Sequence, residues 1–424
     1  MLRQADHARG PSSRLGGPIA LPLAVAALAL VLWLAKPIVF VGGGSDDARY
    51  LAAARAWLAH GPVVGALHWD LRHPLVVPVA AATGLFGEGR LGLLLVPVGY
   101  GLALLLLGVT VLRARFGTGA AAVWGVLFAA NPLVHELATR LYPDLAEAFF
   151  VCASLAACDA AARRPRGAGL LLLAGVAASL AVLTRETSAF LPLLYAVLFA
   201  TGRWLPRRDW LLVAVGALPL LLFDNGWLWA ATGDPLYRLH VALHHVAVPS
   251  NHMAGQVFAG PVLFNPALAE RWTAAGPIDL HWTVNPLLNL FAEPFYGGAF
   301  LLGAVLAWLG WGRLVAEERR WLLRAGAVAA LAFAFVTFAL MVSQRPRYYV
   351  LPLLAVLAFD AVLAARLRDE RKRLVTVLVA LALATSCVIV GLRHAKGQGL
   401  PGRNIAAQQC SASHRALNCA RASS

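Results

Sequence analysis

The chain has 424 residues, of which 60% are hydrophobic and only 13% are charged, whereas soluble domains carry about 25% charged residues. This composition excludes a soluble globular protein and makes lipid the solvent for most of the chain. The net charge of +15 would indicate a nucleic-acid partner in a soluble protein. Here the arginines are concentrated between apolar segments, so a lipid bilayer and no nucleic acid is expected as partner.

Long apolar segments predict an all-α, polytopic membrane protein with about eleven transmembrane helices, since roughly 20 helical residues cross a hydrocarbon core. The expected spans, in chain order, lie at residues 18–41, 90–112, 118–138, 144–162, 168–184, 188–202, 210–231, 288–312, 325–343, 348–365 and 374–392. The first is too long for a signal-peptide core and is expected to be retained. This divides the chain into a cytoplasmic segment 1–17, a transmembrane domain 18–393 and a polar external tail 394–424.

The arginines are distributed unevenly between the two sides of these spans. If the N-terminus is cytoplasmic, the cytoplasmic connections hold most of them, including Arg163, Arg164 and the run from Arg366 to Arg373. This bias predicts a multi-pass protein of the plasma membrane with a cytoplasmic N-terminus. High Ala, Leu and Arg usage indicates a bacterial source, and hence the inner membrane. Cys410 and Cys419 then lie outside, and the sequence leaves open whether they form a disulfide.

Two long segments, 42–89 and 232–287, fall on the external face. In the first, three glycines precede Ser45, and residues 48–60 have an apolar stripe that predicts an interfacial helix capped by Ser45 or Asp46. Residues 74–86 are apolar but too short to span, which predicts a second interfacial or re-entrant helix. The histidines of the second segment are interpreted as solvated.

Ionisable residues converge on this external face. Asp46 and Asp47 follow the first span, and Asp144, which alone would be a helix cap, opens the fourth. The basic residues expected on the same face are Arg72, His73, Arg185 and Arg347. Group transfer from a lipid phosphate requires two kinds of residue. One is a carboxylate that accepts a proton from the attacking hydroxyl, and the other is a set of cations that bind the leaving phosphate.

Several short motifs in this set resemble those of the GT-C superfamily of polytopic glycosyltransferases. The similarity is to the dolichyl-phosphate-mannose-protein mannosyltransferases and the lipid A aminoarabinose transferases. The motifs are Ser45-Asp46-Asp47-Ala48-Arg49-Tyr50, Arg72-His73-Pro74, the external Asp144, Leu183-Thr184-Arg185-Glu186 and Arg347-Tyr348. His73 stands where the family has a lysine. The resemblance implies a GT-C-like fold with an external first loop that carries interfacial helices.

The resemblance also implies roles for these residues. Asp46 would be the catalytic base, with Asp47 and Asp144 completing the catalytic set and serving as ligands if a Mg²⁺ or Mn²⁺ ion takes part. The residues expected to bind the donor phosphate are Arg185, His73, Arg72 and Arg347. Those expected to support the acceptor or the loop are Arg49, Tyr50 and Tyr348. Glu186 is interpreted as an ion-pair partner of Arg185.

The resulting hypothesis is a glycosyltransferase that moves a sugar from a polyprenyl-phosphate donor to a hydroxyl of a glycan, lipid or protein on the external, periplasmic face. A lipid-phosphate donor also agrees with the absence of a Gly-rich nucleotide loop. The alternative is a transporter or lipid-linked sugar flippase, which would use intramembrane acids such as Asp159, Asp224 or Asp360. A non-catalytic scaffold would tolerate loss of Asp46 and Asp144. The sugar, the acceptor, the stereochemistry, the metal requirement and the oligomeric state stay open.

Overall fold

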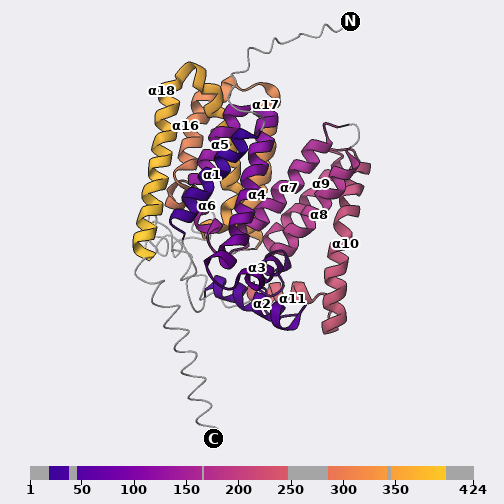
Figure 1. The fold of residues 1–424 in the computed structure, drawn as a ribbon. Helices are drawn as coiled ribbons and strands as arrows, with labels where there is room; N and C mark the ends of the chain where they lie inside the picture. The colour runs from indigo at the N-terminus through magenta and orange to yellow at the C-terminus, as the bar shows by residue number, and fades with distance from the viewer. Residues whose placement is uncertain (1–18, 38–44, 165–166, 247–284, 341–344, 398–424) are drawn as a thin grey trace, which may run out of the picture.

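The computed structural model describes residues 19–37, 45–164, 167–246, 285–340 and 345–397, and in these ranges every regular element is helical (Figure 1). The first half contains α1 (Ala20–Ala35), α2 (Asp46–His60), α3 (His73–Phe86), α4 (Arg90–Phe116), α5 (Thr118–Ala130), α6 (Pro132–Ala138), α7 (Asp144–Ala161), α8 (Ala168–Thr184), η1 (Glu186–Ala189) and α9 (Phe190–Thr201). The second half contains α10 (Arg207–Thr232), α11 (Tyr237–Val246), α15 (Asn285–Ala292), η2 (Pro294–Tyr296), α16 (Ala299–Gly310), η3 (Trp311–Arg313), α17 (Ala316–Ala334), η4 (Phe335–Ala339), η5 (Pro346–Tyr349) and α18 (Val350–Gly397).

Each expected span coincides with helical structure, and five stretches are long and apolar enough to cross a bilayer. These stretches are Arg90–Phe116, Arg207–Thr232, Ala316–Ala339, Pro346–Arg368 and Glu370–Leu392. The first of the last two begins in η5 and continues into α18, and the second lies in the later part of α18, which is interrupted by the non-helical residue Arg371. A sixth span would be α5 and α6 together, bent by 66° at Asn131. The polytopic all-α prediction is confirmed, while the count of about eleven stays a prediction because several helices are shorter.

Two predicted short helices lie at one end of the bundle, where Figure 1 shows α2, α3 and α11 close together. Ser45 caps α2 by accepting a hydrogen bond from the backbone N–H of Ala48, as expected. The apolar faces of α2 and α3 form a core of their own, in which Leu51, Leu75 and Val79 are buried. This packing fixes the beginning of α2, and with it Asp46, against the ends of the longer helices.

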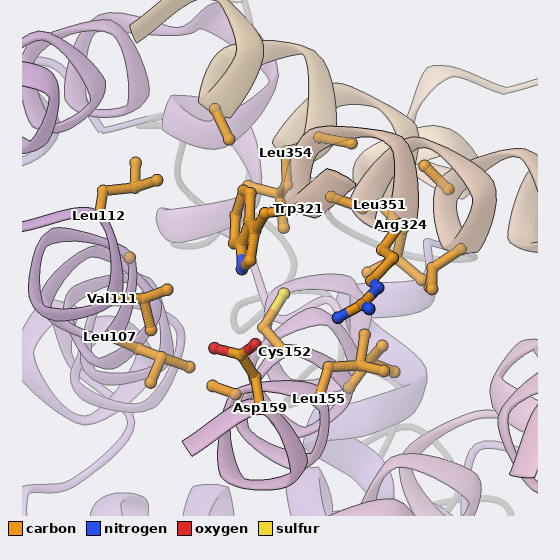
Figure 2. A pocket seen from close by; sticks show the side chains of 18 of the residues that line it. Leu107, Val111, Leu112, Cys152, Leu155, Asp159, Trp321, Arg324, Leu351 and Leu354 are labelled. Atoms are coloured by element: carbon orange, nitrogen blue, oxygen red, sulfur yellow. The ribbon is translucent and has the colours of Figure 1, made fainter. Parts of the chain in front are cut away.

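The opposite end of the bundle is joined by ion pairs between helices that are distant in sequence. Arg115 at the end of α4 pairs with Asp159 of α7 and with Glu317 of α17, and Arg313 pairs with Glu370 of α18. Between this end and the middle of the bundle, α4, α7, α17 and α18 surround a cavity of about 180 Å³ (Figure 2). The cavity therefore does not coincide with the residues predicted to carry the chemistry.

Some predicted features lie outside the described residues. These are the segment 1–17 that was predicted to be cytoplasmic, the three glycines before Ser45, most of the segment 232–287, and Cys410 and Cys419 with the rest of the tail from residue 398.

Candidate active site

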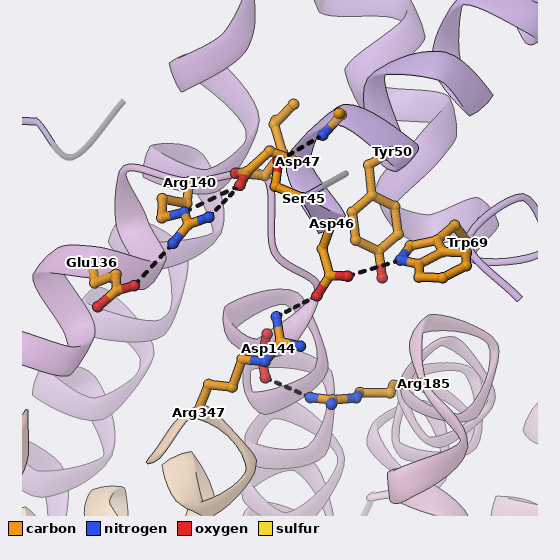
Figure 3. Close-up of polar contacts among 12 residues, drawn as sticks. Ser45, Asp46, Asp47, Tyr50, Trp69, Glu136, Arg140, Asp144, Arg185 and Arg347 are labelled. Carbon is orange, nitrogen blue, oxygen red and sulfur yellow. Dashed lines mark hydrogen bonds and ion pairs between the residues drawn. The ribbon is translucent and has the colours of Figure 1, made fainter. Parts of the chain in front are cut away.

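Asp46 lies where the starts of several helices meet (Figure 3). It is the first residue of α2, while Arg347 belongs to η5, the turn that leads into α18. An Arg347 nitrogen lies 2.6 Å from Oδ2 of Asp46, and the indole N–H of Trp69 donates to Oδ1 at 3.3 Å. The Asp46 side chain is 25% exposed. An outside molecule can therefore approach the carboxylate of Asp46.

The electrostatic surroundings keep Asp46 ionised. Burial acts to raise the pKa of Asp46, but the charge of Arg347 and the hydrogen bonds from Arg347 and Trp69 outweigh it and hold the pKa below its ordinary value. The Arg347 guanidinium in turn lies over the Tyr142 ring, 4.6 Å from its centroid. Since an aromatic face attracts a cation, Tyr142 supports Arg347 in this position.

Asp144 and Arg185 form a second pair beside the first (Figure 3). Asp144 opens α7 and is fully buried, and Arg185 follows α8 in extended backbone. Arg185 donates to Oδ1 of Asp144, whereas Oδ2 is buried and has no partner among the described residues. Arg185 also lies over the ring of Tyr348, 4.2 Å from its centroid. The structure thus brings together five of the predicted site residues, namely Asp46, Asp144, Arg185, Arg347 and Tyr348.

Asp47 points away from this cluster, although it is the sequence neighbour of Asp46. It is fully buried, its Oδ1 accepts the backbone N–H of Leu141 at 2.9 Å, and its Oδ2 accepts from Arg140 (Figure 3). Arg140 pairs further with Glu136 at 3.1 Å. Both carboxylate oxygens of Asp47 are therefore occupied by contacts that tie α2 to the segment before α7.

Arg72 continues the cluster on its other side. Its guanidinium donates to the buried hydroxyl of Tyr50 and lies 3.0 Å from Oε2 of Glu186. The interpretation of Glu186 as the partner of Arg185 is wrong, because Arg185 is directed to Asp144 and Glu186 is left to Arg72. Tyr50 thus supports Arg72 from inside α2.

Arg49 and His73 lie at the edge of the cluster or beyond it. Arg49 is exposed and lies over the Trp69 ring at 5.6 Å from its centroid. His73 binds Oδ1 of Asp224 at 3.1 Å, and Asp224 is also held by Arg238 at 2.8 Å. His73 is therefore engaged with α10 and α11 in this structure, separately from the Asp46 and Arg347 pair.

The residues suggested as metal ligands do not form a joint site. Among the residues that the structure describes, no group of three or more His, Cys, Asp or Glu side chains is suitably placed to hold a metal ion. Asp47 has both oxygens occupied, and Asp144 faces Arg185. This donor set does not fit a divalent cation, so no chemical step is derived through one.

Sequence reasoning missed several residues that complete the site. Arg140 was not among the predicted site residues, yet it pairs with Asp47. Trp69 and Tyr142 carry no charge and were not singled out, although they contact Asp46 and Arg347. The available signal was local, since Tyr142 precedes the Pro143-Asp144 pair and Trp69 lies three residues before Arg72.

Comparison with known proteins supports the resemblance. Residues 72–229 match the family model described as dolichyl-phosphate-mannose-protein mannosyltransferase. No match was found among curated proteins.

The fold is similar to that of solved membrane proteins at low sequence identity. The oligosaccharyltransferase of Archaeoglobus fulgidus, in complex with Zn and sulfate, is 18% identical with a TM-score of 0.56, over 89% of this chain and 53% of that one. The archaeal oligosaccharyltransferase AglB from Archaeoglobus fulgidus, in complex with an inhibitory peptide and a dolichol-phosphate, is 13% identical with a TM-score of 0.54, over 89% of this chain and 55% of that one. ArnT from Cupriavidus metallidurans is 20% identical with a TM-score of 0.43, over 86% of this chain and 76% of that one.

The chain spans about half the length of the archaeal structures that it matches. The family match and the all-helical fold together confirm the resemblance to the GT-C glycosyltransferases that the motifs around Asp46, Asp144 and Arg185 indicated.

Proposed function

We propose that this protein is a membrane glycosyltransferase that moves a sugar from a polyprenyl-phosphate donor to an acceptor hydroxyl on the external face of the membrane. The observation that carries the proposal is the partly exposed carboxylate of Asp46 between Arg347 and Trp69, next to the buried Asp144–Arg185 pair. The archaeal neighbour solved with a dolichol-phosphate and an inhibitory peptide has the same fold, which supports a lipid-phosphate donor.

In the proposed reaction Asp46 takes the proton of the acceptor hydroxyl while that oxygen attacks the anomeric carbon. The bond from that carbon to the phosphate oxygen breaks, and the lipid phosphate leaves as an anion. Arg347 and Arg185 stabilise this developing charge, since guanidinium groups bind phosphate oxygens through two parallel N–H donors.

Arg347 has two partners in this scheme, because it pairs with Asp46 before the donor arrives and with the phosphate afterwards. While it pairs with Asp46 it holds the pKa of that carboxylate low, which makes Asp46 a weak base. When the phosphate draws Arg347 away, burial acts on Asp46 with less opposition and its pKa rises toward the working pH, where a general base is most effective. Donor binding would thus activate the base.

The proposed orientation places this site outside the cytoplasm and the arginine-rich ends of the bundle inside. It is supported by the distribution of arginines along the chain, and it includes about eleven spans, a cytoplasmic N-terminus and the bacterial inner membrane. In this orientation the donor lipid reaches Asp46 laterally from the outer leaflet, which would explain why the site uses cations on helix starts and no nucleotide-binding loop.

The direct test is transfer of a radiolabelled sugar from polyprenyl-phosphate sugars in membranes that contain wild type, Asp46→Asn or Asp144→Asn protein at matched expression. The matched control is Asp234→Asn, which changes an acid paired with His240 outside the cluster. Transfer by wild type and by the control, with loss of at least about 100-fold in Asp46→Asn, is expected for a general base. Equal rates in all four membranes would overturn the proposal.

A transporter is the second candidate, and Asp360 is the observation that favours it. Asp360 is fully buried in α18, and neither of its carboxylate oxygens has a partner among the described residues. Acids in that position are frequent in transport pathways. The other two acids of this hypothesis are paired, Asp159 with Arg115 and Asp224 with Arg238. Sugar transfer that persists in Asp360→Asn favours the transferase, whereas lipid-linked sugar flipping in vesicles that Asp360→Asn abolishes would favour the transporter.

A further inference from the structure

The cavity between α4, α7, α17 and α18 is lined mainly by apolar side chains and is suited to an apolar ligand (Figure 2). It has a volume of about 180 Å³, and its wall consists mainly of leucine, valine and alanine side chains, with Cys152 among them. Apolar cavities of comparable size stay dry and bind small hydrocarbons. Because the protein is surrounded by a bilayer, the hydrocarbon available to this cavity is the acyl chain of a lipid.

Trp204 gives the cavity wall a polar group without a partner. Its indole Nε1 is buried and has no hydrogen-bond partner among the described residues. Its backbone φ is 67°, and it is the one non-glycine residue of the described ranges with a positive φ. A buried N–H without an acceptor is unfavourable, and an acceptor atom supplied by a bound molecule would satisfy it.

Arg324 places an unpaired positive charge at the same cavity. It is exposed, it lines the cavity, and no hydrogen bond or ion pair is found for it in the part of the chain that the structure describes. Figure 2 shows Arg324 and Asp159 on the cavity wall. The Asp159 charge is already compensated by Arg115 and by Arg163 at 3.0 Å. The net charge that the cavity presents is therefore positive.

The position of this charge indicates the direction of entry. Arg324 lies toward the end of the bundle where Arg115, Asp159 and Glu317 meet. The opposite end of the cavity is marked by Leu351, which lies one helical turn after Arg347, and the charge of Arg347 is paired with Asp46. An anionic head group would accordingly be held at the Arg324 end, opposite the candidate active site, with its chain directed into the cavity.

We propose that this cavity binds one acyl chain of a membrane phospholipid with an anionic head group. The phosphate pairs with Arg324, and an ester or phosphate oxygen accepts the N–H of Trp204. This binding site is separate from the proposed donor site, and the inference does not depend on the proposed transfer reaction. An anionic phospholipid would stabilise the contact of α17 with α4 and α7 from the leaflet opposite to Asp46.

The test is native mass spectrometry of the purified full-length protein after incubation with phosphatidylglycerol, phosphatidylcholine or undecaprenyl phosphate. Wild type is expected to retain one phosphatidylglycerol in preference to the other two. Arg324→Ala should weaken that retention by roughly tenfold, because it removes a charge-assisted hydrogen bond. Trp204→Phe, which keeps a ring but removes the N–H, should weaken it a few-fold.

Matched controls separate this site from general lipid adhesion. Arg320→Ala removes an exposed arginine of the same helix whose Nε bonds the carbonyl of Ala316, and Trp229→Phe changes a largely exposed tryptophan of α10. Both should retain the lipid as wild type does. The proposal is overturned if Arg324→Ala binds phosphatidylglycerol as wild type does, if phosphatidylcholine is retained equally, or if undecaprenyl phosphate displaces the phospholipid.

Discussion

Asp46 and Asp47 are adjacent in sequence and each pairs with an arginine, yet their surroundings differ in every respect that matters for chemistry. The Asp46 side chain is 25% exposed, and one of its carboxylate oxygens contacts Arg347 while the other accepts a hydrogen bond from Trp69. Asp47 is fully buried, and a backbone N–H and Arg140 occupy its two oxygens. Successive residues in the first turn of a helix point about 100° apart, so one carboxylate faces the cluster and the other faces the protein core. This difference supports the proposal that Asp46 reacts with the substrate while Asp47 stabilises the fold.

The largest expected effect follows from removing the buried member of this comparison. Asp47→Ala removes the main partner of Arg140, whose side chain is only 11% exposed, which should lower the free energy of unfolding by about 3–5 kcal/mol. Thermal unfolding in detergent measures the change. The double variant Asp47→Leu with Arg140→Met should recover part of the loss, because apolar side chains replace both members of the pair, although Glu136 also loses its contact with Arg140. A double variant as unstable as the single one would contradict this account of Asp47.

The stacked arginine of the second pair should show a smaller effect. Arg185→Lys keeps the charge beside Asp144 but loses the planar group that lies on Tyr348. The kcat/KM for sugar transfer should fall about tenfold, equivalent to ~1.4 kcal/mol. Arg208→Lys, at an exposed position, is the control. Unchanged kcat/KM in Arg185→Lys would mean that the planar guanidinium is not needed at the donor phosphate.

A pH profile sharpens the comparison at Asp46. In wild type the pKa of Asp46 lies below its ordinary value, so its carboxylate stays ionised as the pH falls from about 8 to about 5. Its contribution to stability is present above the unfolded-state pKa and is lost only as the pH falls through the lower folded-state value. Arg347→Ala removes the main lowering influence and leaves burial, so the pKa of Asp46 and the acid limb of the rate profile should move to higher pH. An acid limb in the same place would contradict the coupling of Asp46 to Arg347.

The smallest expected effect is that of metal removal. Because Asp47 has no unoccupied oxygen and Asp144 faces Arg185, EDTA should lower the rate of transfer by less than about twofold. Rates measured before and after addition of EDTA, with Mn²⁺ added back, decide the point. Abolition by EDTA and recovery with Mn²⁺ would show that the carboxylates rearrange around a cation when substrate binds.

The sequence predicted well those features that depend on local chain properties. The lengths of the apolar segments predicted where the helices lie, and Ser45 before two acidic residues predicted the capped start of α2. The motifs also selected Asp46, Asp144, Arg185 and Arg347, which the structure brings together.

Pairings across the bundle could not be predicted, because they depend on how helix ends meet in space. Arg140 contacts Asp47 over 93 residues, and His73 contacts Asp224 over 151. Sequence proximity was misleading in two cases. It suggested a shared role for Asp46 and Asp47, which have different surroundings, and it suggested an ion pair between Arg185 and Glu186, which the structure does not contain. Trp69 and Tyr142 lie next to predicted site residues in the sequence, but their contacts with Asp46 and Arg347 depend on how the chain folds and could not be predicted.

The most direct test of this account compares Asp46→Asn with Asp47→Asn in the same membranes, with both sugar transfer and thermal unfolding measured for each. Asp46→Asn should lose transfer by at least about 100-fold while its unfolding temperature stays close to that of wild type. Asp47→Asn should unfold at a clearly lower temperature and, below that temperature, keep most of its transfer rate. Loss of transfer and of stability together in both variants, or a fully active Asp46→Asn protein, would contradict the division of roles between these two neighbours.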